Sequence, residues 1–124
     1  MQEAFMGKFV ILTKEKGFTF NLKAGNGEII LVSELYNSED GCRNGIASVK
    51  KNAPIANIED QTVKDFEEKK NPKFQIYTDK AGKTRFRLRA RNGEIIGVSE
   101  PYNSKQSCKN GINSVIRNSS SEIK

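Results

Sequence analysis

Alternating apolar and polar residues mark the first regular element of the chain. In FTFNLKA, which begins at Phe18, every second side chain is apolar, and this period of two is typical of a strand with one buried face. The Asn26-Gly27 pair that follows tolerates the positive φ of a tight hairpin turn, and the apolar run EIILVS comes directly after it. Together with KFVIL, which begins at Lys8, the pattern predicts three strands.

After Ser38 the spacing of the apolar residues becomes helical. Cys42, Ile46 and Val49 lie at i, i+4 and i+7, so they share one helix face. Ser38 is well placed as the N-cap of this helix. Gly45 within the helix costs about 1 kcal/mol relative to alanine. We therefore expect the helix backbone to pack closely against the sheet at Gly45.

The whole pattern occurs twice in the chain. The stretch from Asn26 to Asn52 matches the stretch from Asn92 to Asn118 at a constant offset of 66 residues. Upstream, KFVILTKEKGFTFNLKA resembles KFQIYTDKAGKTRFRLRA, which has one extra residue in its first turn. The same strands, turn and helix are therefore expected in both copies.

Each copy is small for an independent domain. A unit of about 60 residues buries only about 60% of its unfolded surface and is marginal alone. We expect a first repeat unit at 1–61 and a second at 73–124, joined by a charged surface linker at 62–72 that ends in Asn71-Pro72. The two units are predicted to share one core and to form a single globular body.

The repeated motifs also carry a family resemblance. FNLKAGNGEIILVSELYNS, with the cysteine and GIASVKKNAP that follow, resembles the YegP-like family of small uncharacterised bacterial proteins, which occur as single units or tandem repeats. The resemblance covers nearly the whole chain. It implies an α+β fold in which two β-β-β-α-β units form one antiparallel sheet, exchange their last strands and carry both helices on one face, with pseudo-two-fold symmetry. The family has no established activity, so no catalytic residues carry over.

The last strand differs between the two copies. In the first unit ANIEDQ supplies it, with Ala56 and Ile58 alternating. The second copy offers only SSSEIK after Asn118, so its last strand is expected to be short or missing. The symmetry of the strand exchange is open at this point.

Composition places the chain among soluble globular proteins. Hydrophobic residues make up 35% and charged residues 29%, and no apolar run approaches the ~20 residues of a membrane span. Glu3 stands where a signal peptide carries basic charge, and Lys8 interrupts the short apolar stretch behind it. We expect a cytoplasmic protein without membrane association, and a monomer.

The two cysteines occupy equivalent positions of the repeat. Cys42 and Cys108 are compatible with a disulfide or with a paired metal site. Burial on helix faces in a cytoplasmic chain favours a third interpretation, in which both are reduced and act as small core hydrophobes. No metal ligands are predicted.

Catalytic chemistry has little support in the sequence. The chain has no histidine, which excludes Ser-His-Asp and Cys-His catalysis and the commonest general base near neutral pH. The repeated Glu34/Glu100 and Tyr36/Tyr102 pairs are better explained as corner residues between strand and helix than as acid-base groups. We expect a non-enzymatic protein without catalytic residues or cofactor.

Charge separates the two copies most clearly. Residues 73–124 contain eleven Lys/Arg and four Asp/Glu, whereas residues 1–72 contain ten and eleven. Much of the surplus lies in the predicted strand RFRLRAR, where alternation directs Phe86 and Leu88 to the core. The opposite, open face then receives Arg85, Arg87, Arg89 and Arg91.

This arginine row is a candidate anion-binding site. Alternate residues of a strand are about 6.6 Å apart, a spacing that can follow the phosphates of a nucleic acid or another polyanion. Tyr77, on the neighbouring strand and the same face, can stack a base. Lys83 and Lys105 complete the predicted site; Lys105 stands at a helix N-terminus, where the dipole favours anions and where the first unit has Glu39.

Two other interpretations of the open face remain. Arginine stems cover apolar surface while their charged ends stay hydrated, so the row can be a soluble cover and no more. In the first unit the same face carries Val10, Leu12 and alternate residues of IILV. Such an apolar patch can form an interface with a protein partner.

Overall fold

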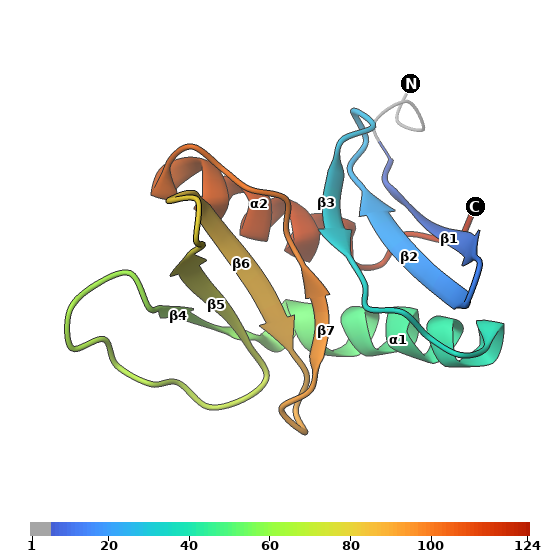
Figure 1. Cartoon of the computed structure of the whole chain (residues 1–124), viewed down its shortest axis with the longest axis horizontal. Coiled ribbons are helices and arrows are strands. Elements are labelled where there is room, and N and C mark those ends of the chain that lie inside the picture. Colours follow the sequence, from blue (N-terminus) through green and yellow to red (C-terminus); the bar gives the residue numbers. More distant parts are fainter. Residues whose placement is uncertain (1–5) are drawn as a thin grey trace.

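Seven strands form one sheet in the order β1-β2-β3-β7-β6-β5-β4 (Figure 1). The computed structural model describes residues 6–124, so the first five residues of the predicted first unit lie outside the described residues. The first unit comprises β1 (Lys8–Lys14), β2 (Gly17–Lys23), β3 (Ile29–Val32), α1 (Glu39–Asn52), the 3-10 helix η2 (Ala53–Ile55) and β4 (Asn57–Asp60). The second comprises β5 (Lys73–Thr78), β6 (Thr84–Arg89), β7 (Ile95–Val98) and α2 (Lys105–Asn118).

The two units meet in the middle of the sheet and exchange chain segments at its edges. Val32 of β3 pairs with Val98 of β7 at the centre. At one edge β4 leaves the first unit and pairs with β5 of the second. At the other edge Ile123 forms a single bridge to Phe9 of β1. The exchange therefore occurs at both edges, and the last strand of the second unit is reduced to one bridge.

The α+β fold of two tandem units is confirmed, with one correction. The sheet is mixed rather than wholly antiparallel, because β4 and the Ile123 bridge both pair in the parallel direction. Each of these segments follows a helix that crosses one face of the sheet. A helical crossover can return the chain parallel to a strand, whereas a two-residue hairpin cannot.

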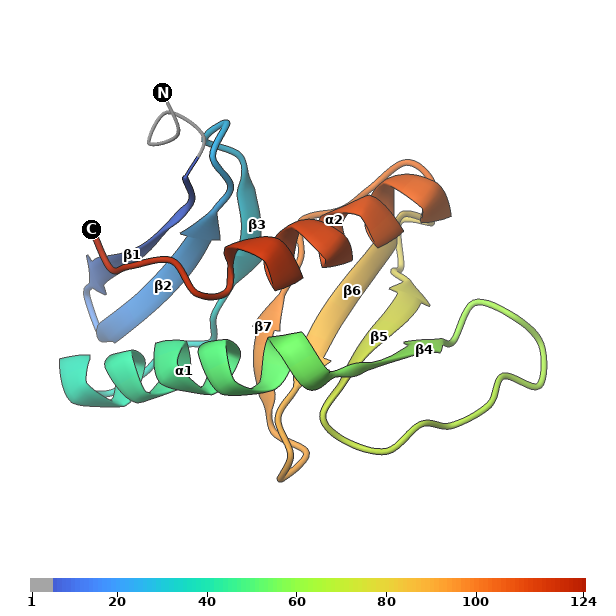
Figure 2. The ribbon, with the colours of Figure 1, turned by 180° about the vertical axis from the view of Figure 1, so that it is seen from behind.

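Both helices cover the same face of the sheet (Figure 2). Helix α1 contacts β2 of its own unit and β7 of the other, and α2 contacts β6 of its own unit and β2 and β3 of the other. Beneath them Phe9 meets Phe20 edge to face at 5.9 Å between ring centroids, and Phe74 meets Phe86 in the same way at 5.7 Å. One contiguous core thus serves both units.

A tyrosine explains the glycine within each helix. The Tyr36 ring stacks on Phe20 with 6.3 Å between centroids. Its hydroxyl lies only 2.2 Å from the position that a Cβ on Gly45 would take, and the Tyr102 hydroxyl stands in the same relation to Gly111. Close packing at Gly45 is confirmed, and the group that requires it is the tyrosine between helix and sheet.

The predicted serine caps form at the start of both helices. The Ser38 and Ser104 side chains accept hydrogen bonds from the backbone N–H groups of Gly41 and Ser107, so both serine N-caps are confirmed. Cys42 and Cys108 are buried and unbonded. Between residues 6 and 124 the structure has no group of three or more His, Cys, Asp or Glu side chains that could hold a metal, and no helix there is long and apolar enough to cross a membrane. Cytoplasmic location and a monomeric state stay predictions.

Candidate anion-binding site

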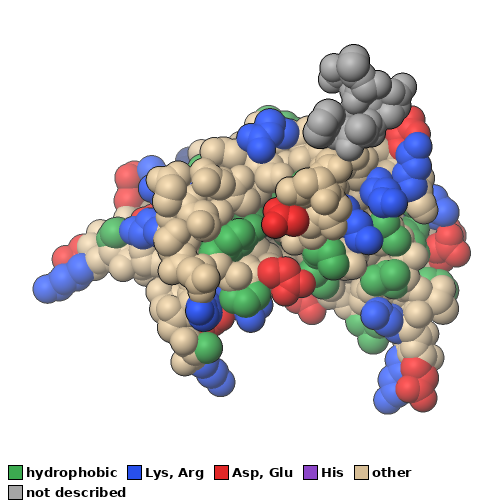
Figure 3. All heavy atoms as spheres, turned by 90° about the horizontal axis from the view of Figure 1, so that it is seen from above, with side chains coloured by type: hydrophobic (Ala, Val, Ile, Leu, Met, Phe, Trp, Pro, Cys, Tyr) green, Lys and Arg blue, Asp and Glu red, His purple; other side chains and the backbone are tan. Residues whose placement is uncertain are grey.

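The open face of the sheet, opposite the helices, is divided into a polar and an apolar half. One row of register partners crosses it from the β4 edge: Glu59, Gln75, Arg87, Val98 and Val32. Strands β4 to β6 thus contribute polar side chains, and β7 and β3 contribute valines. In the view from above, Lys and Arg side chains project along the lower outline of the molecule, with hydrophobic side chains between them (Figure 3).

Arg87 and Arg89 converge on a single neutral oxygen. The Nε atom of each donates to Gln75 Oε1 over 2.7 Å, so the two Nε atoms are at most 5.4 Å apart. Neither guanidinium forms an ion pair with a carboxylate among residues 6–124. We call these two residues the arginine pair. Their like charges are held side by side and bridged only by an amide oxygen.

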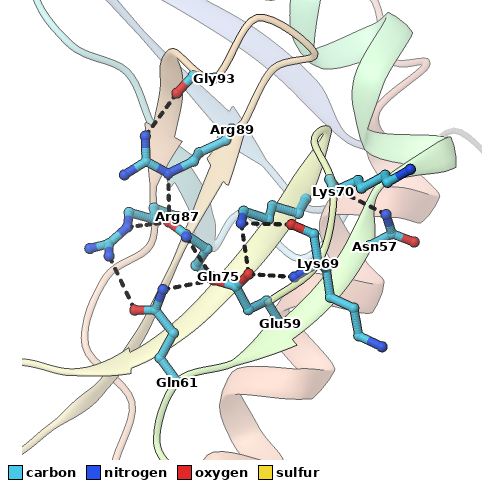
Figure 4. A network of polar contacts seen from close by, with 10 residues as sticks. Asn57, Glu59, Gln61, Lys69, Lys70, Gln75, Arg87, Arg89 and Gly93 are labelled. Atoms are coloured by element: carbon cyan, nitrogen blue, oxygen red, sulfur yellow. Dashed lines mark hydrogen bonds and ion pairs between the residues drawn. The ribbon is translucent and has the colours of Figure 1, made fainter. Parts of the chain in front are cut away.

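A buried polar network holds Gln75 in place (Figure 4). Gln75 Nε2 donates to Glu59 Oε2 over 2.8 Å, and Lys73 Nζ donates to Glu59 Oε1 over 2.7 Å. The three side chains are nearly inaccessible although they belong to the open face: Glu59 is 1% exposed, and Lys73 and Gln75 are 5% exposed. The loop at 61–72 covers them, and the backbone N–H of Lys69 donates to Glu59 Oε1 over 2.8 Å. The network therefore pre-organises the acceptor of the arginine pair.

The electrostatic balance of the network leaves the arginine pair uncompensated. Burial by itself would raise the pKa of Glu59, but hydrogen bonds from Lys73, the Lys69 backbone, Gln75 and Gln61 lower it to about 2. Glu59 is therefore ionised at neutral pH, and its charge balances that of buried Lys73. Both positive charges of the arginine pair remain.

Each guanidinium keeps donors for a ligand. Arg87 also donates to Gln61 Oε1 over 3.3 Å, and Arg89 donates to the Gly93 carbonyl over 2.8 Å. A guanidinium has five N–H donors, so two are used and three remain in each residue. Both side chains are half-buried rather than fully exposed. The arginine pair thus presents oriented donors on the open face.

The other predicted site residues have partners of their own. Arg85 Nε lies 2.7 Å from Asp79 Oδ2, and this hydrogen bond from Arg85 is the main reason that the pKa of Asp79 is lowered. Lys105 Nζ lies 2.8 Å from Asp60 Oδ2 and joins α2 to β4. Lys83 donates to the Asn103 side chain.

Tyr77 and Arg91 lie at the margins of the site. Tyr77 is on the predicted face, but the Arg87 guanidinium lies over its ring at 4.3 Å from the centroid. Stacking of a base on that side of the ring requires Arg87 to move. Arg91 is exposed in the turn between β6 and β7, and it helps to line a hollow of about 480 Å³ with Lys69, Lys70 and Lys73. Of the predicted arginine row, the structure brings only Arg87 and Arg89 together.

Sequence reasoning missed the residues that build the network, namely Lys73, Gln75 and Glu59. The repeat contained a signal for Gln75. At this position on the open face the first unit has the apolar Val10, whereas the equivalent strand of the second unit has a polar side chain. Nothing in the pattern indicated that Glu59 would be buried. Its burial depends on the loop at 61–72, whose Lys69 backbone N–H donates to Glu59.

The first unit provides an internal comparison for this site. Asn21 and Lys23 occupy the positions of Arg87 and Arg89, and Val10 occupies that of Gln75. The same three-stranded arrangement therefore forms without the network. Because a buried ion pair is often no more stable than apolar residues of similar size, the fold alone gives no reason for the network in the second unit.

The fold and the internal repeat define a tandem α+β protein of two strand-exchanged units. The profile of the family described as "Domain of unknown function (DUF1508)" matches the chain twice, at residues 14–60 and 79–124. The chain belongs to this family, whose curated members carry the name UPF0339.

Similar proteins match along most of their length. The chain is 42% identical to UPF0339 protein YegP from Yersinia pestis over 95% of this chain and 93% of that protein. It is 42% identical to UPF0339 protein plu2779 from Photorhabdus laumondii over 88% and 82% of the two chains. The solution structure of YegP from E. coli, described as a protein of unknown function, matches with a TM-score of 0.77 and 38% identity over 96% of this chain and 90% of that one. UPF0339 protein SO3888 from Shewanella oneidensis gives a TM-score of 0.76 and 36% identity, covering 94% and 89%.

Proposed function

We propose that the protein is a binding module whose arginine pair holds an anionic ligand, with nucleic acid as the favoured class of polyanion. The observation that carries the proposal is the convergence of Arg87 Nε and Arg89 Nε on Gln75 Oε1 without a carboxylate partner in residues 6–124. An anion placed against the remaining donors would form charge-assisted hydrogen bonds, which are stronger than neutral ones. It would also relieve the repulsion between the two guanidinium groups.

The divergence of the two units supports the same proposal. The network forms only on the strands of the second unit: in the first unit Val10 takes the position of Gln75, and Lys8, which takes the position of buried Lys73, is exposed. Pre-organised donors bind an anion with little ordering cost. A network that holds Gln75, and through it the arginine pair, is therefore what an anion site would require.

Binding fits the surroundings of the arginine pair better than catalysis does. The side chains that hydrogen-bond to it are Gln61 and Gln75, and Tyr77 packs against Arg87. These groups supply hydrogen bonds and packing rather than proton transfer near neutral pH. Glu59 is engaged by four hydrogen bonds, and its pKa of about 2 makes it a poor general base.

A protein interface on the apolar half of the open face is the second candidate. Val10, Leu12 and Val32 lie there, but all three are half-buried. The large hydrophobic side chains of residues 6–124 with the greatest exposure lie outside β1, β3 and β7. Because a stable protein interface buries about 800 Å² on each partner, these half-buried side chains offer too little apolar surface for one, and this candidate ranks below anion binding.

Fluorescence anisotropy at low salt tests the proposal with labelled single-stranded and double-stranded oligonucleotides. The variant is R87Q/R89Q, which removes both charges but leaves amide groups near Gln75. Glutamate is unsuitable because it would bring a second carboxylate close to the oxygen of Gln75 and to Glu59. The matched control is R43Q/R117Q, which removes two charges from exposed positions on the helices.

We expect wild type and control to bind alike and R87Q/R89Q to bind at least about tenfold more weakly. The slope of log K against log salt is negative, and each lost phosphate contact should make it shallower by about 0.7 on a single strand. The loss of two contacts in the variant should therefore make the slope shallower by about 1.4. If wild type binds no polyanion, or if the two variants lose affinity equally, the proposed site is wrong.

A further inference from the structure

We infer that the ligand of the arginine pair is an unpaired nucleic-acid strand, whose phosphates lie on Arg87 and Arg89 and whose bases lie against apolar side chains of β7 and β3. This inference rests on the proposed anion binding and adds a second recognition surface to it. The apolar side chains are half-buried and occupy register positions beside the arginine pair. We call them the apolar strip: Ile29, Val32, Ile95 and Val98.

Register places the apolar strip directly beside the arginines. Val98 is the cross-strand partner of Arg87, and Ile95 is the partner of Arg89. Val32 is in turn the partner of Val98. Since neighbouring strands are about 4.8 Å apart, the strip begins about 5 Å from the arginine pair and extends to about 10 Å. A ligand that fits both surfaces has anionic groups along one side and flat apolar groups along the other.

A nucleic-acid strand has this character, whereas a polyphosphate or a sulfated sugar has no apolar faces for the strip. The faces of the bases are accessible only when the strand is unpaired, because in a duplex they are stacked on one another. Burial of apolar surface against the strip then adds affinity that phosphate contacts do not supply. The strip also takes the base-binding role that the sequence predicted for Tyr77, because Arg87 covers the Tyr77 ring.

A hollow of about 480 Å³ beyond Arg89 offers a third contact, and its basic lining residues Lys69, Lys70 and Arg91 outnumber the one acidic residue, Glu68. Lys73, the register partner of Arg89, also lines the hollow, but its charge is balanced by Glu59. Residues 87 and 89 are about 6.6 Å apart along the strand, so a backbone that follows β6 in this direction reaches the hollow. The geometry therefore points to a strand that runs along β6 with its bases turned toward β7.

The experiment compares two single strands of equal charge. One is oligothymidylate of about 12 nucleotides, within the usual range of single-strand sites, and the other is an abasic phosphodiester strand of the same length. We expect wild type to bind the thymidylate several-fold more tightly at the same salt concentration. A thymidylate–adenylate duplex should bind more weakly than the single strand.

Substitutions then test whether the apolar strip causes the preference for thymidylate over the abasic strand. V98T and V32T replace a methyl by a hydroxyl with little change of shape; they should reduce the affinity for thymidylate toward that for the abasic strand and leave abasic binding unchanged. V10T is the matched control, because Val10 lies on the same face but two strands beyond Val32, and it should change neither affinity.

The outcomes separate this inference from the proposed function. Equal affinity of wild type for thymidylate and abasic strands, or tighter binding of the duplex, would overturn the inference while anion binding at the arginine pair stands. This comparison uses wild type alone and holds even if a valine variant does not fold. Failure of wild type to bind any of the three probes would overturn the proposed function itself.

Discussion

Lys73 Nζ lies 2.7 Å from Glu59 Oε1, and both side chains are almost completely buried. Glu59 belongs to β4, which the first unit donates, and Lys73 belongs to β5 of the second unit. The ion pair therefore joins the two units at the exchanged strand. It also supports Gln75, the acceptor of the arginine pair.

Replacement of Glu59 by glutamine should be strongly destabilising. The change leaves the Lys73 ammonium buried without a counter-charge, and breaking a buried pair in this way typically costs about 3–5 kcal/mol. Denaturant unfolding at pH 7 measures the loss. Glu67→Gln is the control, because Glu67 pairs with Lys69 on the surface and is 80% exposed, so its loss should change stability by less than about 1 kcal/mol. Similar losses for the two variants would contradict the structural role of the buried pair.

The same carboxylate should make stability sensitive to acid. The pKa of Glu59 in the folded protein is about 2, below its ordinary value of 4.5, so the unfolded chain binds a proton at a higher pH than the folded one. The stability contributed by Glu59 is therefore fully present above about pH 4.5 and is lost as the pH falls toward 2. Unfolding free energies measured between pH 2 and 7 should show less acid dependence in Glu59→Gln than in wild type; parallel profiles would contradict this assignment.

Gly45→Ala should destabilise the protein although alanine favours helix. The added Cβ would lie 2.2 Å from the Tyr36 hydroxyl oxygen and 2.6 Å from its Cζ. Overpacking of this kind costs about 1–3 kcal/mol. Asn44→Ala, at an exposed position of the same helix, is the control and should stabilise by a few tenths of a kcal/mol. Thermal unfolding followed by circular dichroism compares the two, and stabilisation by Gly45→Ala would show that Tyr36 is free to move aside.

The cysteines should be reduced and unreactive in the folded protein. Burial raises the pKa of the Cys108 thiol to about 11, so little thiolate is available near neutral pH. A thiol reagent should react slowly with the native protein. After denaturation without reductant, it should react rapidly with both cysteines. Cys108→Ser should cost about 1–3 kcal/mol because its hydroxyl is buried without an assured partner. Absence of free thiol in the denatured, unreduced protein would instead indicate a disulfide.

The first unit should not fold by itself. In residues 1–72 strand β4 lacks its partner β5, and β3 lacks its partner β7. Helix α1 also loses its contact with β7. We expect residues 1–72 to aggregate or to dimerise when expressed alone, as judged by light scattering and NMR dispersion. A monomer that unfolds cooperatively would contradict the shared core.

Local elements were predictable because their signals are local. The alternation in FTFNLKA, the Asn26-Gly27 turn, the spacing of Cys42, Ile46 and Val49 and the Ser38 cap each act over a few residues. Both copies carry these signals, and the structure forms the corresponding strands, turns and helices in both. Alternation also placed Arg87 and Arg89 on the open face.

Only the tertiary structure decided which arginines act together. Arg85 and Arg87 look equivalent in the sequence, but register and turn geometry bring Asp79 to the first and Gln75 to the second. Burial of Glu59 depends on strand exchange and on the path of the loop at 61–72. Together they bring Glu59 to Lys73 and Gln75, which lie 14 and 16 positions further along the chain. Alternation along one strand determines the face of a side chain, whereas its partners depend on neighbouring strands and loops, whose positions are set by packing of the whole core.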